Sequence, residues 1–164
     1  MGHEWSIDAS TQLERVRSAA LPMAFNRTPH FRDGLMLIGD SAGMVSPFNG
    51  EGIDYALESA RIAADVIVTH HRMPEHRRRV ALQEYPEIVR DRFGGYFTLG
   101  RVFADLIGRP ELMSIGIKYG MGVEALMTFA VRLLGNIHRE GDDADAMDRV
   151  IAALIRSVPA TTNS

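Results

Sequence analysis

The sequence predicts an α/β fold in which short strands are followed by a mostly α-helical carboxyl-terminal region. Leu35 to Ile38 form a short apolar run between Gly34 and Gly39, which is typical of a strand covered on both faces. From Gly52 onward, apolar and small residues recur at the spacing of one helical face. The second half of the chain keeps helical periodicity, so helices outweigh strands.

Composition places the chain among globular proteins and narrows its chemistry. Of 164 residues, 46% are apolar and 24% are charged, which suits one domain with a real core. The absence of cysteine excludes disulfides and thiol-based metal or redox chemistry, and it fits a cytoplasmic protein. A formal net charge of −3 provides no general basic field, so we expect no nucleic-acid partner. Met1-Gly2-His3 has no signal-peptide pattern.

The segment before the apolar run predicts a strand and a turn. We expect a strand over Gln12 to Met23, because apolar residues recur there before Pro22. Asn26 to Gly34 is polar and contains Pro29, so it predicts a hairpin-like loop. His30 in that loop could be a ligand, but a solvated histidine is the default.

The helix that follows Gly52 is predicted from two opposed faces. Its predicted core face consists of apolar and small side chains, namely Ile53, Ala56, Leu57, Ala60, Ala63, Ala64 and Ile67. Its predicted solvent face consists of the charged residues Asp54, Glu58, Arg61 and Asp65. A surface helix with one buried side accounts for this pattern.

The turn between strand and helix has the layout of a ligand site. Asp40 follows the strand, at the edge where open α/β sheets bind ligands. Pro47 restricts the backbone, and Gly50 and Gly52 let a ligand approach it closely. The helix start attracts electron-rich groups, whereas an ionised aspartate suits hydroxyl groups. Each piece alone also occurs in ordinary turns, but their combination in one short window favours a site.

These motifs resemble those of a known family. Gly39-Asp40-Ser41-Ala42-Gly43 and the stretch from Ser46 to Ile53, Ser-Pro-Phe-Asn-Gly-Glu-Gly-Ile, resemble the second flavin-binding motif of FAD-dependent oxidoreductases of the aromatic-hydroxylase fold. The sequence of the second stretch is most similar to that of the geranylgeranyl reductase family, and within it to the actinobacterial polyprenyl and menaquinone reductase branch.

The resemblance implies an FAD cofactor and a role for each motif residue. Asp40 would bind the ribityl chain, with Gly39 of the same motif also cofactor-binding, and the turn and helix start would face the flavin ring through Pro47, Gly50, Glu51, Gly52 and Ile53. It also implies an isoprenoid lipid or quinone substrate and an external electron donor. A helix start beside the ring would stabilise the charge of a reduced flavin.

The resemblance runs from about Trp5 to Ile155 but matches only the carboxyl-terminal part of the family. No Gly-x-Gly-x-x-Gly turn for the ADP half of FAD is present, so we expect a fragment of the FAD-binding fold. The predicted division is residues 1–73 as the last part of the FAD-binding domain and 74–164 as a helical region.

A histidine and arginine segment follows the first helix. His70, His71 and His76 lack metal-ligand spacing, so we expect no metal site. The run Arg77 to Arg79 predicts a solvated helix flank by default. Contact with anionic lipids is the alternative, which would make the protein peripheral on the inner face of the membrane.

The remaining chain predicts three helical stretches. Pro86 suits a first helical position, and Gly108-Arg109-Pro110 suits a stop and a new start. Between them lies an aromatic and aliphatic face of Val89, Phe93, Tyr96, Phe97, Phe103, Leu106 and Ile107.

Leu112 to Leu134 is apolar almost all round, but its internal charges argue against a membrane span. It is either a helix buried against the flavin domain or, by the resemblance, a wall around a lipid tail. A last helix begins near Asp142 to Asp145, where acidic residues complement the helix dipole better than they bind a cation.

The resemblance implies a reductase that saturates double bonds in a geranylgeranyl group or a menaquinone tail. A monooxygenase of aromatic rings shares the Gly-Asp and Pro-x-x-Gly motifs and is one alternative. A non-catalytic helical lipid-binding or interaction module is the other. No catalytic residue is identified, because Tyr55 and Glu51 are merely near the motif. We expect the chain alone to retain FAD weakly.

Overall fold

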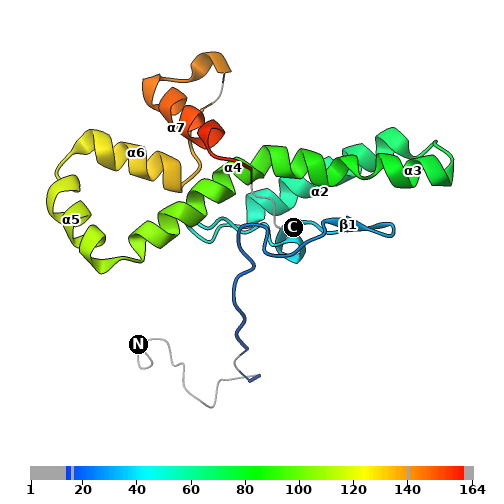
Figure 1. The fold of residues 1–164 in the computed structure, drawn as a ribbon, viewed down its shortest axis with the longest axis horizontal. Helices are drawn as coiled ribbons and strands as arrows, with labels where there is room; N and C mark the ends of the chain where they lie inside the picture. The colour runs from blue at the N-terminus through cyan, green and yellow to red at the C-terminus, as the bar shows by residue number, and fades with distance from the viewer. Residues whose placement is uncertain (1–13, 16, 140, 161–164) are drawn as a thin grey trace.

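The computed structural model describes residues 14, 15, 17–139 and 141–160 as a mostly helical chain with two short strands (Figure 1). A hairpin of β1 (Phe31–Arg32) and β2 (Leu35–Met36) leads into the short 3₁₀ helix η2 (Gly39–Ala42). The α-helices are α2 (Ile53–His70), α3 (Glu75–Ala81), α4 (Glu84–Ile107), α5 (Pro110–Gly120), α6 (Glu124–Leu134) and α7 (Ala146–Ser157), with the 3₁₀ turn η3 (Gly141–Asp143) before α7. Within the described ranges, none of the helices has the length and apolar character needed to cross a membrane.

The core lies between α2 and α4, which run antiparallel. Tyr55 of α2 packs edge-on against Phe93 and Phe97 of α4, with ring centroids 5.2 and 4.9 Å apart. At the far end of the pair, Nε2 of His70 lies 2.8 Å from a carboxylate oxygen of Glu84. The same core includes Leu133 of α6 and Ile151 of α7. Residues on both sides of the predicted boundary at 73/74 therefore share one core, and that boundary stays a prediction.

The hairpin has a local cause in its turn. Asp33 and Gly34 both have positive φ, 51° and 85°, as the tight turn between twisted antiparallel strands requires. Phe31 pairs with Met36 and Arg32 pairs with Leu35. The hairpin predicted within Asn26 to Gly34 is confirmed, with β1 included in it.

The strand predicted over Leu35 to Ile38 as buried on both faces is wrong. β2 has two residues, and the Leu35 side chain is 65% exposed. A strand is covered on both faces only when neighbouring strands and outer layers flank it, and in the described chain β2 pairs with β1 alone.

The strand predicted over Gln12 to Met23 is also wrong where it can be checked. Residues 14, 15 and 17–22 form no helix or strand, while residues 12, 13 and 16 lie outside the described part. Met23 makes an isolated parallel bridge with Val45. A single bridge does not supply the ladder that an extended strand needs.

The predicted start of α2 is confirmed, because Gly52 is its N-cap and Ile53 its first residue. The predicted core face is wrong in phase. Ile53 and Leu57 are 77% and 68% exposed, whereas the buried residues are Tyr55, Ser59, Ile62, Ala63 and Val66. The large aromatic and branched side chains of this second face pack against α4, which leaves most of the first face exposed.

Two further predictions concern α4. It begins at Glu84, two residues before Pro86, and it ends as predicted at Gly108, with Pro110 as the first residue of α5. Its predicted face is buried from Val89 to Phe97, but Leu106 and Ile107 are exposed. The carboxyl-terminal end of α4 extends beyond α2 (Figure 1), and there Phe103 is half-buried with its ring 5.6 Å from that of Phe48.

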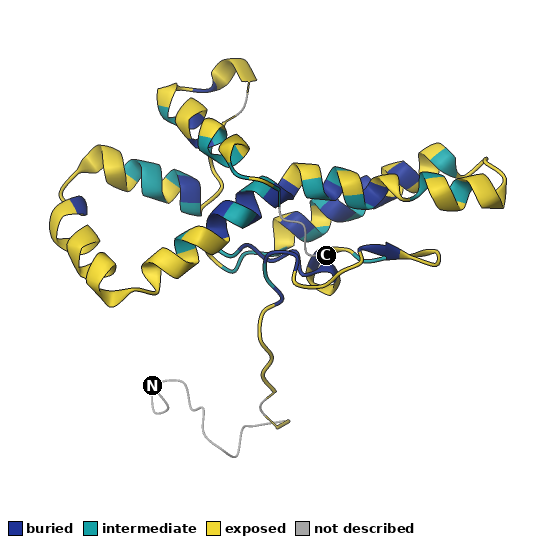
Figure 2. Cartoon of the chain, in the orientation of Figure 1, coloured by how far each residue is buried: buried dark blue, intermediate teal, exposed yellow. Residues whose placement is uncertain are grey.

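The stretch Leu112 to Leu134 forms two helices, joined by residues 121–123. Burial against the flavin domain, one of the two alternatives predicted for this stretch, is not found in the described chain, because α5 buries only Gly120 and α6 only Leu133. Figure 2 shows α5 and much of α6 as exposed. Exposed apolar side chains on this helix pair include Ile115, Ile117, Tyr119, Leu126 and Val131. The α5 helix follows the carboxyl-terminal end of α4, whereas the end of α6 returns to the middle of α4, where Tyr96 donates to the Leu133 carbonyl at 2.9 Å.

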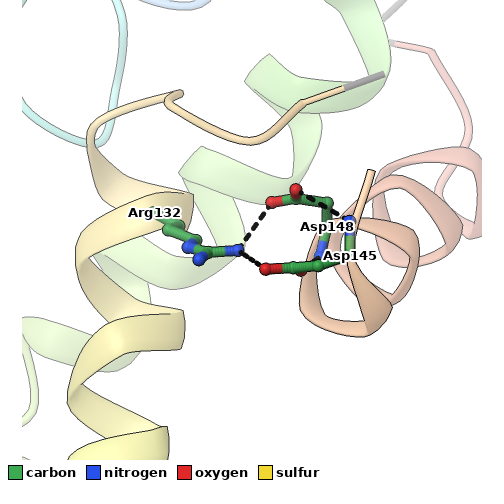
Figure 3. A network of polar contacts seen from close by, with 3 residues as sticks. All are labelled: Arg132, Asp145 and Asp148. Atoms are coloured by element: carbon green, nitrogen blue, oxygen red, sulfur yellow. Dashed lines mark hydrogen bonds and ion pairs between the residues drawn. The ribbon is translucent and has the colours of Figure 1, made fainter. Parts of the chain in front are cut away.

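The helix α7 is capped and tied to α6 (Figure 3). Asp145 is the N-cap, and its carboxylate accepts a hydrogen bond from the Asp148 backbone N–H at 2.9 Å. Arg132 donates from Nη1 to Asp145 at 2.6 Å and to Asp148 at 2.9 Å. The Asp148 backbone N–H and Arg132 together hold the pKa of the Asp145 carboxyl below its usual value. The predicted capping role of the acidic segment is confirmed.

His30 is buried, so the prediction that it is solvated is wrong. The side chain is 6% exposed, and its ring lies 4.8 Å from the ring of Phe25. Burial lowers the pKa of the imidazole, so the neutral form is favoured. Packing against Phe25 replaces the solvation predicted for this residue.

Candidate functional site

A hollow of about 410 Å³ lies where η2, the following turn and the start of α2 meet. Its lining combines one carboxylate, two glycines and a group of apolar side chains, namely Leu21, Asp40, Val45, Gly50, Gly52, Ile53, Ala56 and Leu57. The arrangement provides one acidic end beside a mainly apolar wall.

The segment leading to Asp40 is held by side chains from α2 and α4. Ser59 of α2 accepts a hydrogen bond from the Gly39 N–H at 3.1 Å, and Tyr85 of α4 donates to the Leu37 carbonyl at 2.7 Å. Gly39 has a φ of +50°, and a Cβ there would lie 2.7 Å from the Ala56 Cβ. Glycine is therefore required for η2 to approach α2, and this approach positions Asp40 at the hollow.

Asp40 faces the backbone of the helix start. A Cβ on Gly52 would lie 3.0 Å from Oδ1 of Asp40 and 3.2 Å from Cγ2 of Val45. The absence of a side chain at Gly52 thus keeps the space beside the carboxylate open. Asp40 itself is exposed, so its carboxylate can accept hydrogen bonds from a ligand.

The turn from Ser46 to Glu51 is closed by its own hydrogen bonds and by α6. The Ser46 N–H donates to the Glu51 carbonyl at 2.7 Å, and the Gly50 N–H donates to the Ser46 carbonyl at 2.9 Å. The Asn49 side chain accepts from the Glu51 N–H at 2.9 Å and donates to the Leu134 carbonyl at 3.0 Å. The carboxyl-terminal end of α6 therefore helps to set the shape of this turn.

Pro47 is held from a different side. A Cβ on Gly100 of α4 would lie 2.4 Å from Cγ of Pro47, closer than any real carbon contact. The ring of Phe48 lies 4.8 Å from the ring of Tyr96. This close packing fixes the proline against α4 and away from the hollow.

The start of α2 has one of its backbone donors already occupied. Oε1 of Glu51 accepts a hydrogen bond from the Asp54 N–H at 2.7 Å. This carboxylate complements the positive end of the helix dipole, which a bound anion would otherwise do. Glu51 is therefore a helix cap in this structure.

Four of the seven predicted site residues line the hollow: Asp40, Gly50, Gly52 and Ile53. The other three support it, since Gly39 packs on α2, Pro47 packs on α4, and Glu51 caps the helix. Sequence reasoning missed Leu21, Val45, Ala56 and Leu57 as lining residues. Ala56 and Leu57 had a signal, because they share the Ile53 face of α2.

A second, more polar hollow of about 280 Å³ lies on the other side of α2. Its walls come from α2, α4 and the segment after α6, and include Asp54, Tyr55, Glu58, Arg92 and Asn136. Burial raises the pKa of the Tyr55 phenol, and Asn136 donates to its oxygen at 3.4 Å. Tyr55 therefore belongs to this second hollow, and only Ile53, Ala56 and Leu57 of α2 face the first.

The chain is similar in sequence to known reductases. It is 35% identical over 147 residues to the menaquinone reductase of Mycobacterium tuberculosis, which covers 90% of this chain and 33% of that protein. It is 42% identical over 86 residues to digeranylgeranylglycerophospholipid reductase 3 of Methanosphaera stadtmanae, which covers 52% of the chain and 21% of that protein. The chain belongs to a geranylgeranyl reductase-like family.

Membership of the geranylgeranyl reductase-like family confirms the resemblance carried by the Gly-Asp and Pro-x-Asn-Gly-Glu-Gly-Ile motifs. A shorter match, 33% identical over 66 residues, or 36% of the chain and 13% of that protein, is to kynurenine 3-monooxygenase of Neurospora crassa. No family profile matches the chain. No solved structure matches it either. The chain spans about a third of the length of the menaquinone reductases it matches.

Proposed function

We propose that this chain forms the ribityl and ring side of an FAD site in a reductase that saturates double bonds of an isoprenoid chain. The observation that carries the proposal is the hollow in which Asp40, Gly50, Gly52 and Ile53 meet. Family membership supports it, since relatives of this chain are named for the reduction of menaquinone and of geranylgeranyl lipids. A geranylgeranyl group or a menaquinone tail is the proposed substrate.

The residues at the hollow fit the flavin end of FAD. The exposed carboxylate of Asp40 suits the hydroxyl groups of a ribityl chain, which donate hydrogen bonds to it. Gly50 and Gly52 leave the backbone bare, so a flat ring can approach it. The apolar side chains of Ile53 and Leu57 would cover one face of such a ring.

The residues that line and support the hollow have parts in this proposal that are separate from the redox step. Asp40 orients the cofactor, and the apolar wall of Leu21, Val45 and Leu57 excludes water from the ring. Gly39, Pro47 and Glu51 hold the shape of the turn and of the helix start. The flavin, when bound, supplies the hydride chemistry, and an external electron donor would keep it reduced.

The exposed apolar surface of α5 and α6 is the proposed wall for the isoprenoid tail. Asn49 links the end of α6 to the turn through the Leu134 carbonyl at 3.0 Å, and this bond supports a tail site near the flavin site. In this division, residues 1–73 complete the FAD-binding domain and residues 74–164 form the tail-binding helical region. Peripheral contact with a membrane stays a prediction.

A chimeric enzyme tests the proposed reaction. This chain would replace the matched 147 residues of the Mycobacterium tuberculosis menaquinone reductase. Incubation with menaquinone and reduced flavin should give a product with one fewer double bond in its tail, detected by mass spectrometry. A hydroxylated product with oxygen consumption would support the monooxygenase instead, and a soluble chimera without either product would refute catalysis.

Flavin binding tests the role of Asp40 separately. In the chimera, Asp40→Asn should weaken FAD binding by about tenfold or more, because hydrogen bonds to a charged group are worth about 1.5–3 kcal/mol. Asp65→Asn is the control, since Asp65 pairs with Arg61 on an exposed part of α2. Equal FAD affinity in the two variants would contradict the assignment of Asp40.

A further inference from the structure

A third hollow, of about 330 Å³, lies between α7 and the segment that follows α6. Its lining consists of three arginines, one aspartate and small residues, namely Arg139, Gly141, Ala144, Asp148, Arg149, Ala152 and Arg156. It shares no lining residue with the cofactor hollow or with the polar hollow beside Tyr55. We call it the arginine hollow, and its chemistry is independent of the proposed flavin site.

The three arginines reach the arginine hollow from two segments. Arg149 and Arg156 lie seven residues apart on α7, so they project from one side of the helix about 10 Å apart along its axis. Ala152 lies between them, and its small side chain leaves the space between the two arginines open. Arg139 belongs to the segment after α6. Three guanidinium groups therefore border one unfilled space.

The carboxylate of the arginine hollow is already neutralised. Among the described lining residues, Asp148 alone is acidic, and it is 2% exposed. Arg132 donates to one of its oxygens at 2.9 Å, and the Asp145 backbone N–H donates to the other at 3.2 Å (Figure 3). Both oxygens are thus used in the contact between α6 and α7.

The three lining arginines differ from Arg132 in this respect. Within the part of the chain that the structure describes, no carboxylate pairs with the guanidinium of Arg139, Arg149 or Arg156. Asp142 and Asp143 of η3 are exposed but do not line the hollow. Positive charges that share one hollow repel one another, so an anion bound between them is stabilised.

A phosphate group matches these arginines better than a carboxylate does. Each guanidinium is a planar fork that donates parallel hydrogen bonds to either anion. A carboxylate has only two oxygens, whereas a phosphate monoester has three terminal oxygens and a charge of about −2 at pH 7. A phosphate midway between Arg149 and Arg156 would lie about 5 Å along the helix axis from each, which an arginine side chain can span.

We propose that Arg139, Arg149 and Arg156 form a binding site for a phosphate monoester group, either on a soluble molecule or on a lipid headgroup. Inorganic phosphate is the probe for the first source. Vesicles of phosphatidylcholine with phosphatidic acid, a lipid that carries a phosphate monoester, are the probe for the second.

Titration calorimetry of the 164-residue chain with inorganic phosphate, at constant ionic strength because salt screens charges, tests the soluble source. Arg149→Gln and Arg156→Gln should each weaken binding about tenfold or more, because each removes charge-assisted hydrogen bonds. Arg61→Gln is the matched control, since it removes the same charge from an exposed position on α2. Circular dichroism confirms that each variant is folded.

Co-sedimentation with vesicles tests the lipid source. Vesicles with phosphatidylglycerol, a phosphate diester, at equal surface charge are the control for general attraction to an anionic surface. If inorganic phosphate does not bind, preferential binding to phosphatidic acid that is lost in Arg149→Gln and Arg156→Gln, but kept in Arg61→Gln, assigns the site to a lipid headgroup.

Three results would overturn the proposal. The first is that neither inorganic phosphate nor phosphatidic acid binds. The second is that Arg61→Gln weakens binding as much as Arg149→Gln and Arg156→Gln do, because net charge would then account for it. The third is that inorganic phosphate does not bind and the two kinds of vesicle bind equally, because the chain would then respond to surface charge without recognising a phosphate monoester.

Discussion

Replacement of Ser59 by alanine should weaken the support beneath Asp40 without touching the hollow. The Ser59 hydroxyl is fully buried, accepts from the Gly39 N–H at 3.1 Å and donates to the Ala56 carbonyl at 3.2 Å. Its loss leaves the buried Gly39 N–H without this acceptor, which costs about 1–3 kcal/mol. Alanine recovers about 0.5 kcal/mol of helix propensity. The expected loss of unfolding free energy is therefore about 0.5–2.5 kcal/mol.

Thermal unfolding followed by circular dichroism measures this loss. For a chain of this size, the expected decrease in Tm is about 1–10 °C, at about 2–4 °C per kcal/mol. Ser114→Ala is the control, because Ser114 is exposed in the middle of α5 and gains the same helix propensity. If Ser59→Ala unfolded within about 0.5 kcal/mol of this control, the hydrogen bond to Gly39 would not hold the segment and the reasoning would be refuted.

Two more predictions follow from the glycines and the buried tyrosines. Gly100→Ala should destabilise the chain by about 1–3 kcal/mol through overpacking against Pro47, whereas Gly116→Ala, with open space at its Cβ, should be neutral or stabilise α5 by up to about 1 kcal/mol. Urea unfolding of both variants checks this, and a change of the same sign would contradict it. Burial raises the pKa of Tyr85 and of Tyr96 to about 12, so the stability they contribute is fully present below pH 10 and is lost as the pH rises through 12. Phenolate absorbance should rise in those two residues only on unfolding above pH 10, and titration of both well below this range in the folded chain would count against their burial.

The parts of the fold that the sequence predicts correctly are those with a local cause. The hairpin follows from the positive φ that Asp33 and Gly34 tolerate, and the start of α5 follows from Pro110. Asp145 caps α7 through its own carboxylate. Each of these features depends on a few neighbouring residues, so a short window of sequence contains the information.

The parts that could not be predicted depend on which surface an element meets. The α2 helix has two apolar faces, and periodicity alone does not say that Tyr55 rather than Ile53 packs on α4. The exposure of Leu35 and of the α5 and α6 side chains has the same origin, because an apolar pattern records a preference for burial without supplying the partner.

The candidate site shows the same division. Asp40, Gly50 and Gly52 were predicted from the residues of the motif and Ile53 from the family resemblance, and all four line the hollow. Leu21 and Val45 reach it through packing that no motif describes. The cap made by Glu51 was missed for another reason, since the free helix start was predicted from backbone geometry without considering which side chain would occupy it.

The bond from Asn49 to the Leu134 carbonyl has a consequence for synthesis of the protein. It joins residues 85 positions apart, and Asn49 also shapes the turn through the Glu51 N–H. During translation, residues 39–53 leave the ribosome long before α6 is made, so the turn gains this support only after α6 has been added to the chain. The final shape of the turn thus depends on a helix whose last residue is made 85 residues after Asn49 in the chain.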